Sequence, residues 1–268
     1  MPWVRFRQQG QICWGQLHRS GDTDFIQVFS GTPFDEGCRP AASTERLPLA
    51  ATPLLAPCEP SKIVCVGRNY GAHARELGHE APSEPLFFLK PPSALLDPGG
   101  TILLPALSQQ VEYEGELGLV IRRRCSHFGA GEDPRPYILG YTCVNDVTAR
   151  DLQRRDLQWT RAKGFDTFCP VGPWVVEAPT DSAEPWKGLD LETCVNGSVR
   201  QRGNTRDFLF SLPQLLHAIT AVMTLEPGDV LATGTPAGVG PLHAGDRVSV
   251  TIAGVGSLEN PVAATPAP

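Results

Sequence analysis

The sequence lacks the features that would place it in a membrane or on a nucleic acid. It has no run of about 18 consecutive apolar residues, so no membrane-spanning helix is expected. Its first residues, MPWVRFRQQG, lack the apolar core of a signal peptide, which predicts a cytoplasmic protein. The 23 basic residues are outnumbered by 29 acidic ones, and the net charge of −6 argues against nucleic acid or an anionic membrane surface as a partner.

Several common enzyme motifs are also missing. The eight cysteines are scattered without a C-x-x-C pair, which indicates free thiols rather than disulfides or a zinc site. The glycine-rich segment TGTPAGVGP, residues 233–241, lacks the Gly-Lys-Ser/Thr ending of a phosphate-binding loop and does not match the dinucleotide-binding pattern. No Gly-x-Ser-x-Gly elbow occurs, which argues against a serine hydrolase.

Glycine and proline are abundant instead, with 27 and 26 residues in a chain of 268. This composition favours short strands and turns over long helices. Residues 1–47 alternate apolar and polar side chains in short segments, which predicts a small β-rich unit. Residues 48–60, rich in proline and alanine, are interpreted as a linker that crosses the surface. We therefore divide the chain into an N-terminal domain with its linker, 1–57, and a larger domain, 58–268.

The larger domain is predicted to contain strands broken by turns, and two helices. Apolar segments predict strands at 62–66, 86–89, 111–121 and 138–144, and the pair Asn196-Gly197 predicts a hairpin turn. Residues 146–162 lack interior glycine and proline and carry a partial apolar stripe, which predicts a helix. Residues 211–224 are predicted as a second helix with Ser211 as its N-cap.

Three glutamates stand at alternate positions in VEYEGELGLVI, namely Glu112, Glu114 and Glu116. Side chains in a strand have a period of two, so the three carboxylates should point to one face. The apolar residues that follow indicate burial, and an unpaired buried ion costs several kcal/mol. Either this face is open to water, as on an edge strand, or a cation binds there. Oxygen ligands favour magnesium, manganese or calcium over zinc.

Asp146, in VNDVTARD, lies where a strand is predicted to end and a helix to begin. Its carboxylate is either the N-cap of that helix or a third oxygen ligand beside Glu114 and Glu116. Three carboxylates leave about three positions free on an octahedral ion, enough for water and a bidentate substrate.

Other polar residues are candidates for catalysis or for binding an anion. His73 and Glu76 are three residues apart in a predicted helical turn, so they form either an imidazole base oriented by a carboxylate or an exposed pair without function. Lys163 either turns inward to meet an anion or interacts with the dipole of the preceding helix. Arg68 and Arg150 present the same choice.

Six segments resemble, in the same order, motifs of the fumarylacetoacetate hydrolase family, and they cover most of residues 61–262. They are IVCVGRNYGAHARELG, EPLFFLKPPSAL, VEYEGELGLVI, YTCVNDVTARDLQ, WTRAKGFDTFCPVGPWV and GDVLATGTPAGVGPLHAGDRVSVTIAGVGSLENPV. The resemblance implies an α+β, β-rich fold with a mixed β-roll as catalytic domain, usually dimeric. Residues 1–57 then look like the small N-terminal β domain of longer members.

The resemblance also implies roles for individual residues. It implies that Glu114, Glu116 and Asp146 hold Mg²⁺ or Mn²⁺ and that Lys163 is the active-site lysine. Substrate-binding candidates are Arg68, Arg150, Gln153 and Thr235. His73 and Glu76 match the lid dyad of members that cleave or decarboxylate their substrates.

Together these residues predict a divalent-metal-dependent hydrolase that cleaves a carbon–carbon bond in an acylpyruvate or related 2,4-dioxo acid. The ion would stabilise the enolate formed on cleavage, His73 oriented by Glu76 would activate water, and Lys163 would hold the oxyanion or the substrate carboxylate. One alternative is an isomerase, tautomerase or decarboxylase of a 2-oxo acid at the same metal site. Another is a non-catalytic module with a structural cation. We expect a small anionic 2-oxo acid as substrate and a homodimer as the assembly.

Overall fold

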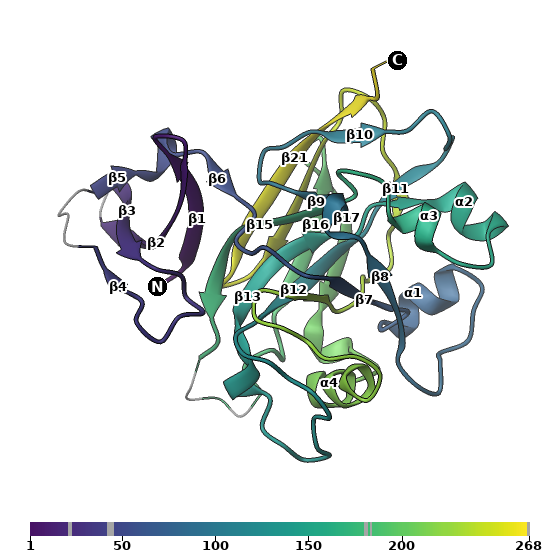
Figure 1. Cartoon of the computed structure of the whole chain (residues 1–268). Helices are drawn as coiled ribbons and strands as arrows, with labels where there is room; N and C mark the ends of the chain where they lie inside the picture. Colours follow the sequence, from purple (N-terminus) through teal and green to yellow (C-terminus); the bar gives the residue numbers. More distant parts are fainter. Residues whose placement is uncertain (21–22, 42–45, 180–181, 183, 267–268) are drawn as a thin grey trace.

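The protein consists of a small strand-rich unit at the N-terminus and a larger body with strands at its centre and short helices at its periphery (Figure 1). The computed structural model describes residues 1–20, 23–41, 46–179, 182 and 184–266. Parallel pairs, such as β18 (Val230–Ala232) with β7 (Ile63–Gly67), occur together with antiparallel pairs, such as β20 (Arg247–Ile252) with β21 (Gly256–Ala264), in a β-rich α+β fold. This arrangement confirms the predicted fold class.

The N-terminal unit is an antiparallel sheet with a core of its own. Its strands are β1 (Trp3–Gln8), β2 (Gln11–Ser20), β3 (Thr23–Ser30), β4 (Arg39–Pro40), β5 (Arg46–Pro48) and β6 (Leu54–Leu55). Alternate residues of the first three strands point inward, and Val4, Phe6, Leu17 and Ile26 form a buried cluster. The alternation of residues 1–47 therefore predicted this unit correctly.

The segment predicted as a surface linker is built into the fold. After a 3-10 turn, η1 (Leu49–Ala51), strand β6 pairs with β1, and Ala56 and Cys58 are fully buried. The prediction that residues 48–60 cross the surface holds for residues 48–55, which are exposed or half-buried, and is wrong for residues 56–58, which pack inward. β1 also pairs with β15 (Cys169–Glu177), so the N-terminal sheet continues into the larger body. The division into 1–57 and 58–268 stays a proposal.

The sheet that continues from β15 runs through the larger body. Its further strands, in spatial order, are β13 (Ile138–Asn145), β12 (Gly115–Ile121), β18 (Val230–Ala232), β7 (Ile63–Gly67) and β8 (Leu86–Lys90), and β9 (Leu95–Leu96) pairs with β15. Every residue of β12 and β13 is buried. Burial on both faces explains why these segments read as continuous apolar runs, and the strands predicted there are confirmed.

A second sheet of five strands packs against the first through a shared apolar core. Its strands are β10 (Ile102–Leu104), β16 (Asp190–Val195), β17 (Ser198–Asn204), β20 (Arg247–Ile252) and β21 (Gly256–Ala264). The hairpin β16–β17 turns at Asn196 and Gly197, whose φ angles are 51° and 76°. Positive φ at both central residues is the geometry that Asn-Gly favours, so the predicted turn is confirmed.

Three short strands hold the acidic segment in place. β11 (Val111–Tyr113) lies between β14 (Thr148–Ala149) and β19 (Gly240–Pro241), so the single strand predicted for 111–121 is two strands with a break at Glu114. At the break the Glu114 amide donates to Asn145 Oδ1 at 3.0 Å, and the Glu114 carbonyl accepts from the Asp146 amide at 2.8 Å. These bonds bring Glu114 beside Asp146, 32 residues later.

The predicted helix 146–162 is wrong. This segment contains β14, then α2 (Arg150–Arg155), and then α3 (Thr160–Lys163). Asp146 precedes β14 and therefore caps no helix. Leu157, assigned to the apolar stripe, lies fully exposed between the two helices, whereas Trp159 packs its ring against Phe88 with centroids 5.2 Å apart. Tertiary packing overrides the weak helical periodicity here.

The second predicted helix is confirmed as α4 (Leu212–Thr220), although it ends earlier than expected. The amide and hydroxyl of Ser211 both donate to Gln214 Oε1 at 2.8 Å, as in a capping box. The remaining helical elements are α1 (Gly71–Glu76) and the 3-10 turns η2 (Pro92–Ala94), η3 (Arg135–Tyr137) and η4 (Thr205–Asp207). Within the described ranges, every helix falls short of the length and apolarity needed to cross a membrane.

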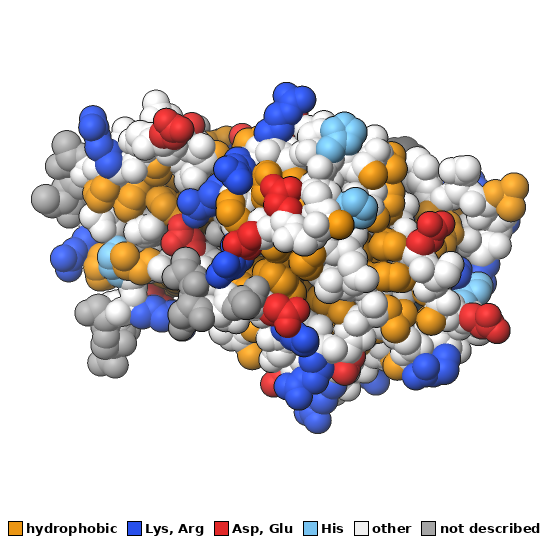
Figure 2. Space-filling view, turned by 90° about the horizontal axis from the view of Figure 1, so that it is seen from below, with side chains coloured by type: hydrophobic (Ala, Val, Ile, Leu, Met, Phe, Trp, Pro, Cys, Tyr) orange, Lys and Arg blue, Asp and Glu red, His pale blue; other side chains and the backbone are white. Residues whose placement is uncertain are grey.

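The surface mixes charges of both signs. On the face seen in Figure 2, acidic and basic side chains are interspersed among hydrophobic ones. The eight cysteines are free thiols, and five of them are buried, as their scattered spacing predicted.

Candidate metal centre and active site

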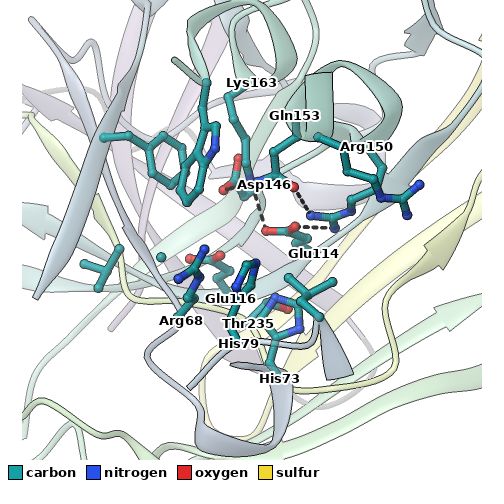
Figure 3. Close-up of a pocket in the computed structure, with 16 residues that line it drawn as sticks. Arg68, His73, His79, Glu114, Glu116, Asp146, Arg150, Gln153, Lys163 and Thr235 are labelled. Atoms are coloured by element: carbon teal, nitrogen blue, oxygen red, sulfur yellow. Dashed lines mark hydrogen bonds and ion pairs between the residues drawn. The ribbon is translucent and has the colours of Figure 1, made fainter. Parts of the chain in front are cut away.

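A cavity of about 430 Å³ gathers most of the residues that the sequence singled out. This volume suits a small organic acid. The predicted site residues that line it are Arg68, His73, Glu114, Glu116, Asp146, Arg150, Gln153, Lys163 and Thr235. Figure 3 shows Lys163 and Arg150 on one side of the acidic residues and His73 and His79 on the other.

Three carboxylates meet inside the cavity. Glu114 comes from the break between β11 and β12, Glu116 from β12, and Asp146 from the residue after β13. One oxygen from each lies within 4.8 Å of the others, and all three side chains are buried. The interpretation of these glutamates as solvated edge-strand charges is therefore wrong. The donor set is entirely carboxylate oxygen, which suits a hard divalent cation.

Lys163, at the end of α3, contacts two of the three carboxylates. Its Nζ lies 2.9 Å from Glu114 Oε2 and 2.6 Å from Asp146 Oδ2. The side chain is 2% exposed, so it turns inward to meet anions rather than remaining at the helix end in solvent. Of the two alternatives weighed from the sequence, the first is confirmed.

Lys90, at the end of β8, is a site residue that sequence reasoning missed. Its buried ammonium donates to Asp146 Oδ1 at 2.6 Å and to the carbonyl of Val147 at 3.0 Å. Lys90 lies outside the cavity lining, behind Asp146. The only signal in the sequence was a lysine directly after the apolar run Leu86–Leu89, a position where a solvated lysine is equally common.

Glu112 is the partner of Arg150 rather than a metal ligand. Arg150 Nε donates to Glu112 Oε2 at 2.7 Å, Nη2 to Glu114 Oε1 at 2.5 Å, and Nη1 to Gln153 Oε1 at 2.6 Å. Each guanidinium nitrogen therefore has a protein partner, although Arg150 and Gln153 still line the cavity. The alternating glutamates thus differ in their contacts. Glu112 binds Arg150 outside the cavity lining, whereas Glu114 and Glu116 line the cavity.

Fixed cations neutralise the acidic cluster only in part. Burial alone would raise the pKa of Glu114, but the ammonium of Lys163 and the guanidinium of Arg150 outweigh it and hold that pKa well below its usual value. Glu116 has no such partner: among the described residues, no lysine or arginine pairs with it. Burial, with the nearby charges of Asp146 and Glu114, raises the pKa of Glu116 well above its usual value.

The cluster is therefore short of positive charge, and a divalent cation fits it. Four buried carboxylates, those of Glu112, Glu114, Glu116 and Asp146, face three buried cations, those of Lys90, Arg150 and Lys163. Burying a charged carboxylate without a counter-ion costs several kcal/mol of folding free energy, and a bound cation removes this cost. Glu114, Glu116 and Asp146 are the residues that would hold such an ion.

The glycine-rich segment holds Glu116 from behind. The Gly234 amide donates to Glu116 Oε2 at 2.7 Å, and the φ of Gly234 is +101°. A Cβ at this position would meet Asn69 Cβ at 2.8 Å, so only glycine fits. The Thr235 hydroxyl donates to the Gly115 carbonyl at 2.8 Å, which leaves its substrate-binding role as a proposal.

His73 and Glu76, on α1, form the predicted pair. Nδ1 of His73 lies 3.1 Å from Glu76 Oε2, and the other carboxylate oxygen of Glu76 accepts from the Gly238 amide at 2.9 Å. His73 is buried in the cavity wall whereas Glu76 is exposed, so the alternative of an exposed pair fails for the imidazole only. The bond to Gly238 fixes the carboxylate that orients the imidazole.

Arg68 adds a cation at the cavity wall without a carboxylate partner among the described residues. It directly follows β7 and has a φ of +58°, in the left-handed region, so the extended strand conformation ends before this residue. An arginine that lacks an internal counter-ion beside a cavity suits an anionic ligand.

Comparison with known proteins places the chain in an enzyme family. Residues 62–263 match the family model described as fumarylacetoacetate (FAA) hydrolase C-terminal, and residues 1–57 match the model Rv2993c-like, N-terminal. Among relatives named for an activity, "Oxaloacetate decarboxylase, mitochondrial" of Dictyostelium discoideum is 43% identical over 72% of this chain and 89% of its own length. "Oxaloacetate tautomerase YisK" of Bacillus subtilis is 41% identical over 76% and 70%.

A solved structure is similar over nearly the whole chain. It is named 5-carboxymethyl-2-hydroxymuconate delta-isomerase from Mycobacterium smegmatis, has a TM-score of 0.88 and 43% identity, and the match covers 99% of this chain and 100% of that one. With one family model matching residues 62–263 and relatives above 40% identity, the chain belongs to the fumarylacetoacetate hydrolase family.

Proposed function

We propose that this protein catalyses proton transfer beside the carbonyl of a small 2-oxo dicarboxylic acid of the oxaloacetate type, as a metal-dependent tautomerase or isomerase. The observation that carries the proposal is Glu116, a fully buried carboxylate without a cation partner next to Glu114 and Asp146. The relatives named as a tautomerase, an isomerase and a decarboxylase favour the alternative weighed from the sequence, an isomerase, tautomerase or decarboxylase of a 2-oxo acid, over hydrolysis of an acylpyruvate, which is the main prediction there. The homodimer and the cytoplasmic location stay predictions.

The acidic trio would hold Mg²⁺ or Mn²⁺. When bound, such an ion supplies a Lewis acid that polarises the 2-oxo group and favours the enolate. Glu114, Glu116 and Asp146 each contribute carboxylate oxygen to it. Arg68, Gln153 and Thr235 lie on the cavity wall and would orient the substrate carboxylates.

Lys163 serves as a fixed cation rather than as a base. Burial works to lower its pKa, but Asp146 and Glu114 outweigh burial and raise the pKa above the usual value of a lysine. The ammonium therefore keeps its protons at physiological pH. It donates hydrogen bonds to oxygen atoms where negative charge develops and takes no proton from the substrate.

His73 is the group suited to moving the proton. An ionised Glu76 carboxylate only accepts hydrogen bonds, so its contact assigns the ring hydrogen to Nδ1 of His73. Nε2 is then free to take a proton from the carbon next to the 2-oxo group. The same nitrogen returns the proton to the enol oxygen or to the carbon, which interconverts the keto and enol forms without net change in protons.

Carbon–carbon cleavage, by decarboxylation or hydrolysis, is the second candidate. The oriented pair His73 and Glu76 favours it, because such a pair can also activate water. Both reactions use the same enolate, so the residues that hold the ion serve either one.

A single assay tests the proposal. Purified protein is mixed with oxaloacetate enriched in its enol form, with Mn²⁺ or with a chelator, and the loss of enol absorbance and the release of carbon dioxide are followed together. We expect metal-dependent loss of the enol well above the rate with Mn²⁺ alone. Cleavage of acylpyruvates without tautomerase activity would support the hydrolase instead, and no activity on any 2-oxo acid would support a non-catalytic module.

Metal affinity should rise with pH across the pKa of Glu116. Because burial, Asp146 and Glu114 raise that pKa, the folded metal-free protein keeps the proton on Glu116 to a higher pH than an ordinary glutamate does, and below that pKa the ion must displace it. The folded state therefore favours the protonated Glu116 carboxyl. Without metal, the free energy of unfolding should fall as the pH rises and Glu116 ionises. Calorimetric titration with Mn²⁺ in buffers of different protonation enthalpy should show about one proton released below that pKa and none above it. Affinity that is independent of pH would contradict the assignment.

A further inference from the structure

Apart from the contacts of Lys163, each carboxylate of the acidic trio has one oxygen that accepts a hydrogen bond from a donor of the protein. Arg150 Nη2 donates to Glu114 Oε1 at 2.5 Å, and the Gly234 amide donates to Glu116 Oε2 at 2.7 Å. Lys90 Nζ donates to Asp146 Oδ1 at 2.6 Å. These three donors come from α2, the glycine-rich segment and β8. Three separate parts of the fold thus each donate to one oxygen of one carboxylate.

The pattern leaves one oxygen of each carboxylate for the cavity. These are Glu114 Oε2, Glu116 Oε1 and Asp146 Oδ2. Lys163 Nζ, the cation that reaches into the trio from the cavity side, contacts two of these oxygens, Glu114 Oε2 and Asp146 Oδ2. A cation bound in the cavity would therefore contact the oxygens that accept no hydrogen bond from the three donors.

The number of oxygens offered bears on which cation fits. Calcium takes six to eight oxygen ligands and commonly binds carboxylates through both oxygens, whereas magnesium demands an octahedron of six at shorter distances. Three carboxylates restricted to one oxygen each suit the smaller ion and disfavour calcium. Selectivity between the two follows ligand number and flexibility.

We propose that Lys90 is a positioning residue that sets metal selectivity, by holding Asp146 Oδ1 so that Asp146 offers a single oxygen to Mg²⁺ or Mn²⁺ and cannot chelate Ca²⁺. This inference rests on the proposed metal site. Lys90 is suited to the task because its ammonium is anchored on the Val147 carbonyl at 3.0 Å and is buried. Lys90 does not line the cavity, so its replacement removes no group that meets the substrate.

The test compares Ca²⁺ and Mn²⁺ binding in the wild type and in Lys90→Met, Lys90→Arg and Lys62→Met. Bound Mn²⁺ is measured by electron paramagnetic resonance while Ca²⁺ is added as competitor, without substrate. In Lys90→Met, Asp146 is free to present both oxygens. The ratio of the Ca²⁺ dissociation constant to the Mn²⁺ dissociation constant should therefore fall by about ten- to a hundredfold. Lys90→Arg keeps a charged donor and should restore most of the preference.

Lys62→Met is the matched control. Lys62 also donates to a buried aspartate, Asp229 Oδ2 at 2.5 Å, and neither residue lines the cavity. Its loss should leave the ratio of the two affinities unchanged. If Lys90→Met does not fold, Lys90→Gln takes its place, because the shorter neutral side chain removes the ammonium from Asp146 Oδ1 and should narrow the preference in the same direction.

Two results overturn the inference, and they are distinguishable. In the first, wild type and Lys90→Met both bind Mn²⁺, and their preference for Mn²⁺ over Ca²⁺ is the same. Lys90 then does not set selectivity, while the proposed metal site stands. A wild-type protein that binds neither ion would remove the metal site and the proposed function with it.

Discussion

Glu116→Gln should abolish metal binding and turnover while leaving the metal-free protein about as stable as the wild type. In the metal-free protein Glu116 is buried without a cation partner and its pKa is raised, so its neutral form is favoured there more than in an ordinary glutamate. A glutamine has nearly the same shape, and its carbonyl oxygen can still accept from the Gly234 amide at Oε2. We therefore expect the free energy of unfolding without metal to change by less than about 1 kcal/mol.

The measurement is unfolding with and without Mn²⁺. An ion present at about 100 times its dissociation constant stabilises the wild type by about 2.7 kcal/mol, and this gain should vanish in Glu116→Gln. Turnover should fall to the rate seen with chelator. Retention of the Mn²⁺-dependent stabilisation would show that Glu116 is not a ligand.

Glu112→Gln is the matched control, because Glu112 is also a buried glutamate in the same acidic segment. Its carboxylate pairs with Arg150 at 2.7 Å, and removing one partner of a buried pair costs about 3 kcal/mol. Glu112→Gln should therefore destabilise the protein strongly and still gain stability from Mn²⁺. The two variants are expected to show opposite patterns at positions four residues apart.

Local patterns in the sequence predicted the acidic trio because strand geometry is regular. The alternation of Glu114 and Glu116 fixes both on one face, and an apolar run ending before Asp146 places that residue at a strand end. The hairpin at Asn196-Gly197 and the capping box at Ser211 follow from similarly local chemistry. The hairpin and the capping box are determined by residues close together in the chain, whereas Asp146 reaches the two glutamates through contacts across more than 30 positions.

The rest of the site depends on contacts between distant residues, which no local pattern encodes. Lys90 meets Asp146 across 56 positions, and Arg150 meets Glu112 across 38. The sequence predicts that water or a metal ion compensates the acidic residues, whereas the chain supplies three buried cations of its own, Lys90, Arg150 and Lys163. The helix expected at 146–162 failed for a related reason, because Trp159 packs on Phe88 and divides the segment into two short helices.

His73→Asn should lower proton transfer by about 10²- to 10⁴-fold without changing metal affinity. Asparagine is polar and smaller than histidine, but it has no group that takes up a proton near neutral pH. His73 contacts Glu76 and none of the acidic trio through a hydrogen bond, so the binding of Mn²⁺ should stay at the wild-type level. The initial rate of enol loss and the Mn²⁺ dissociation constant are measured on the same preparation.

His79→Asn provides the control, because His79 lines the same cavity but has no carboxylate partner among the described residues. Its substitution should change the rate far less than that of His73. Glu76→Gln should fall between the two: a glutamine has one acceptor oxygen, whereas Glu76 serves both the imidazole and the Gly238 amide. A different result is that His73→Asn keeps full tautomerisation and loses only cleavage. The pair His73 and Glu76 then activates water, and another group carries the proton. That result would favour the hydrolase or decarboxylase interpretation.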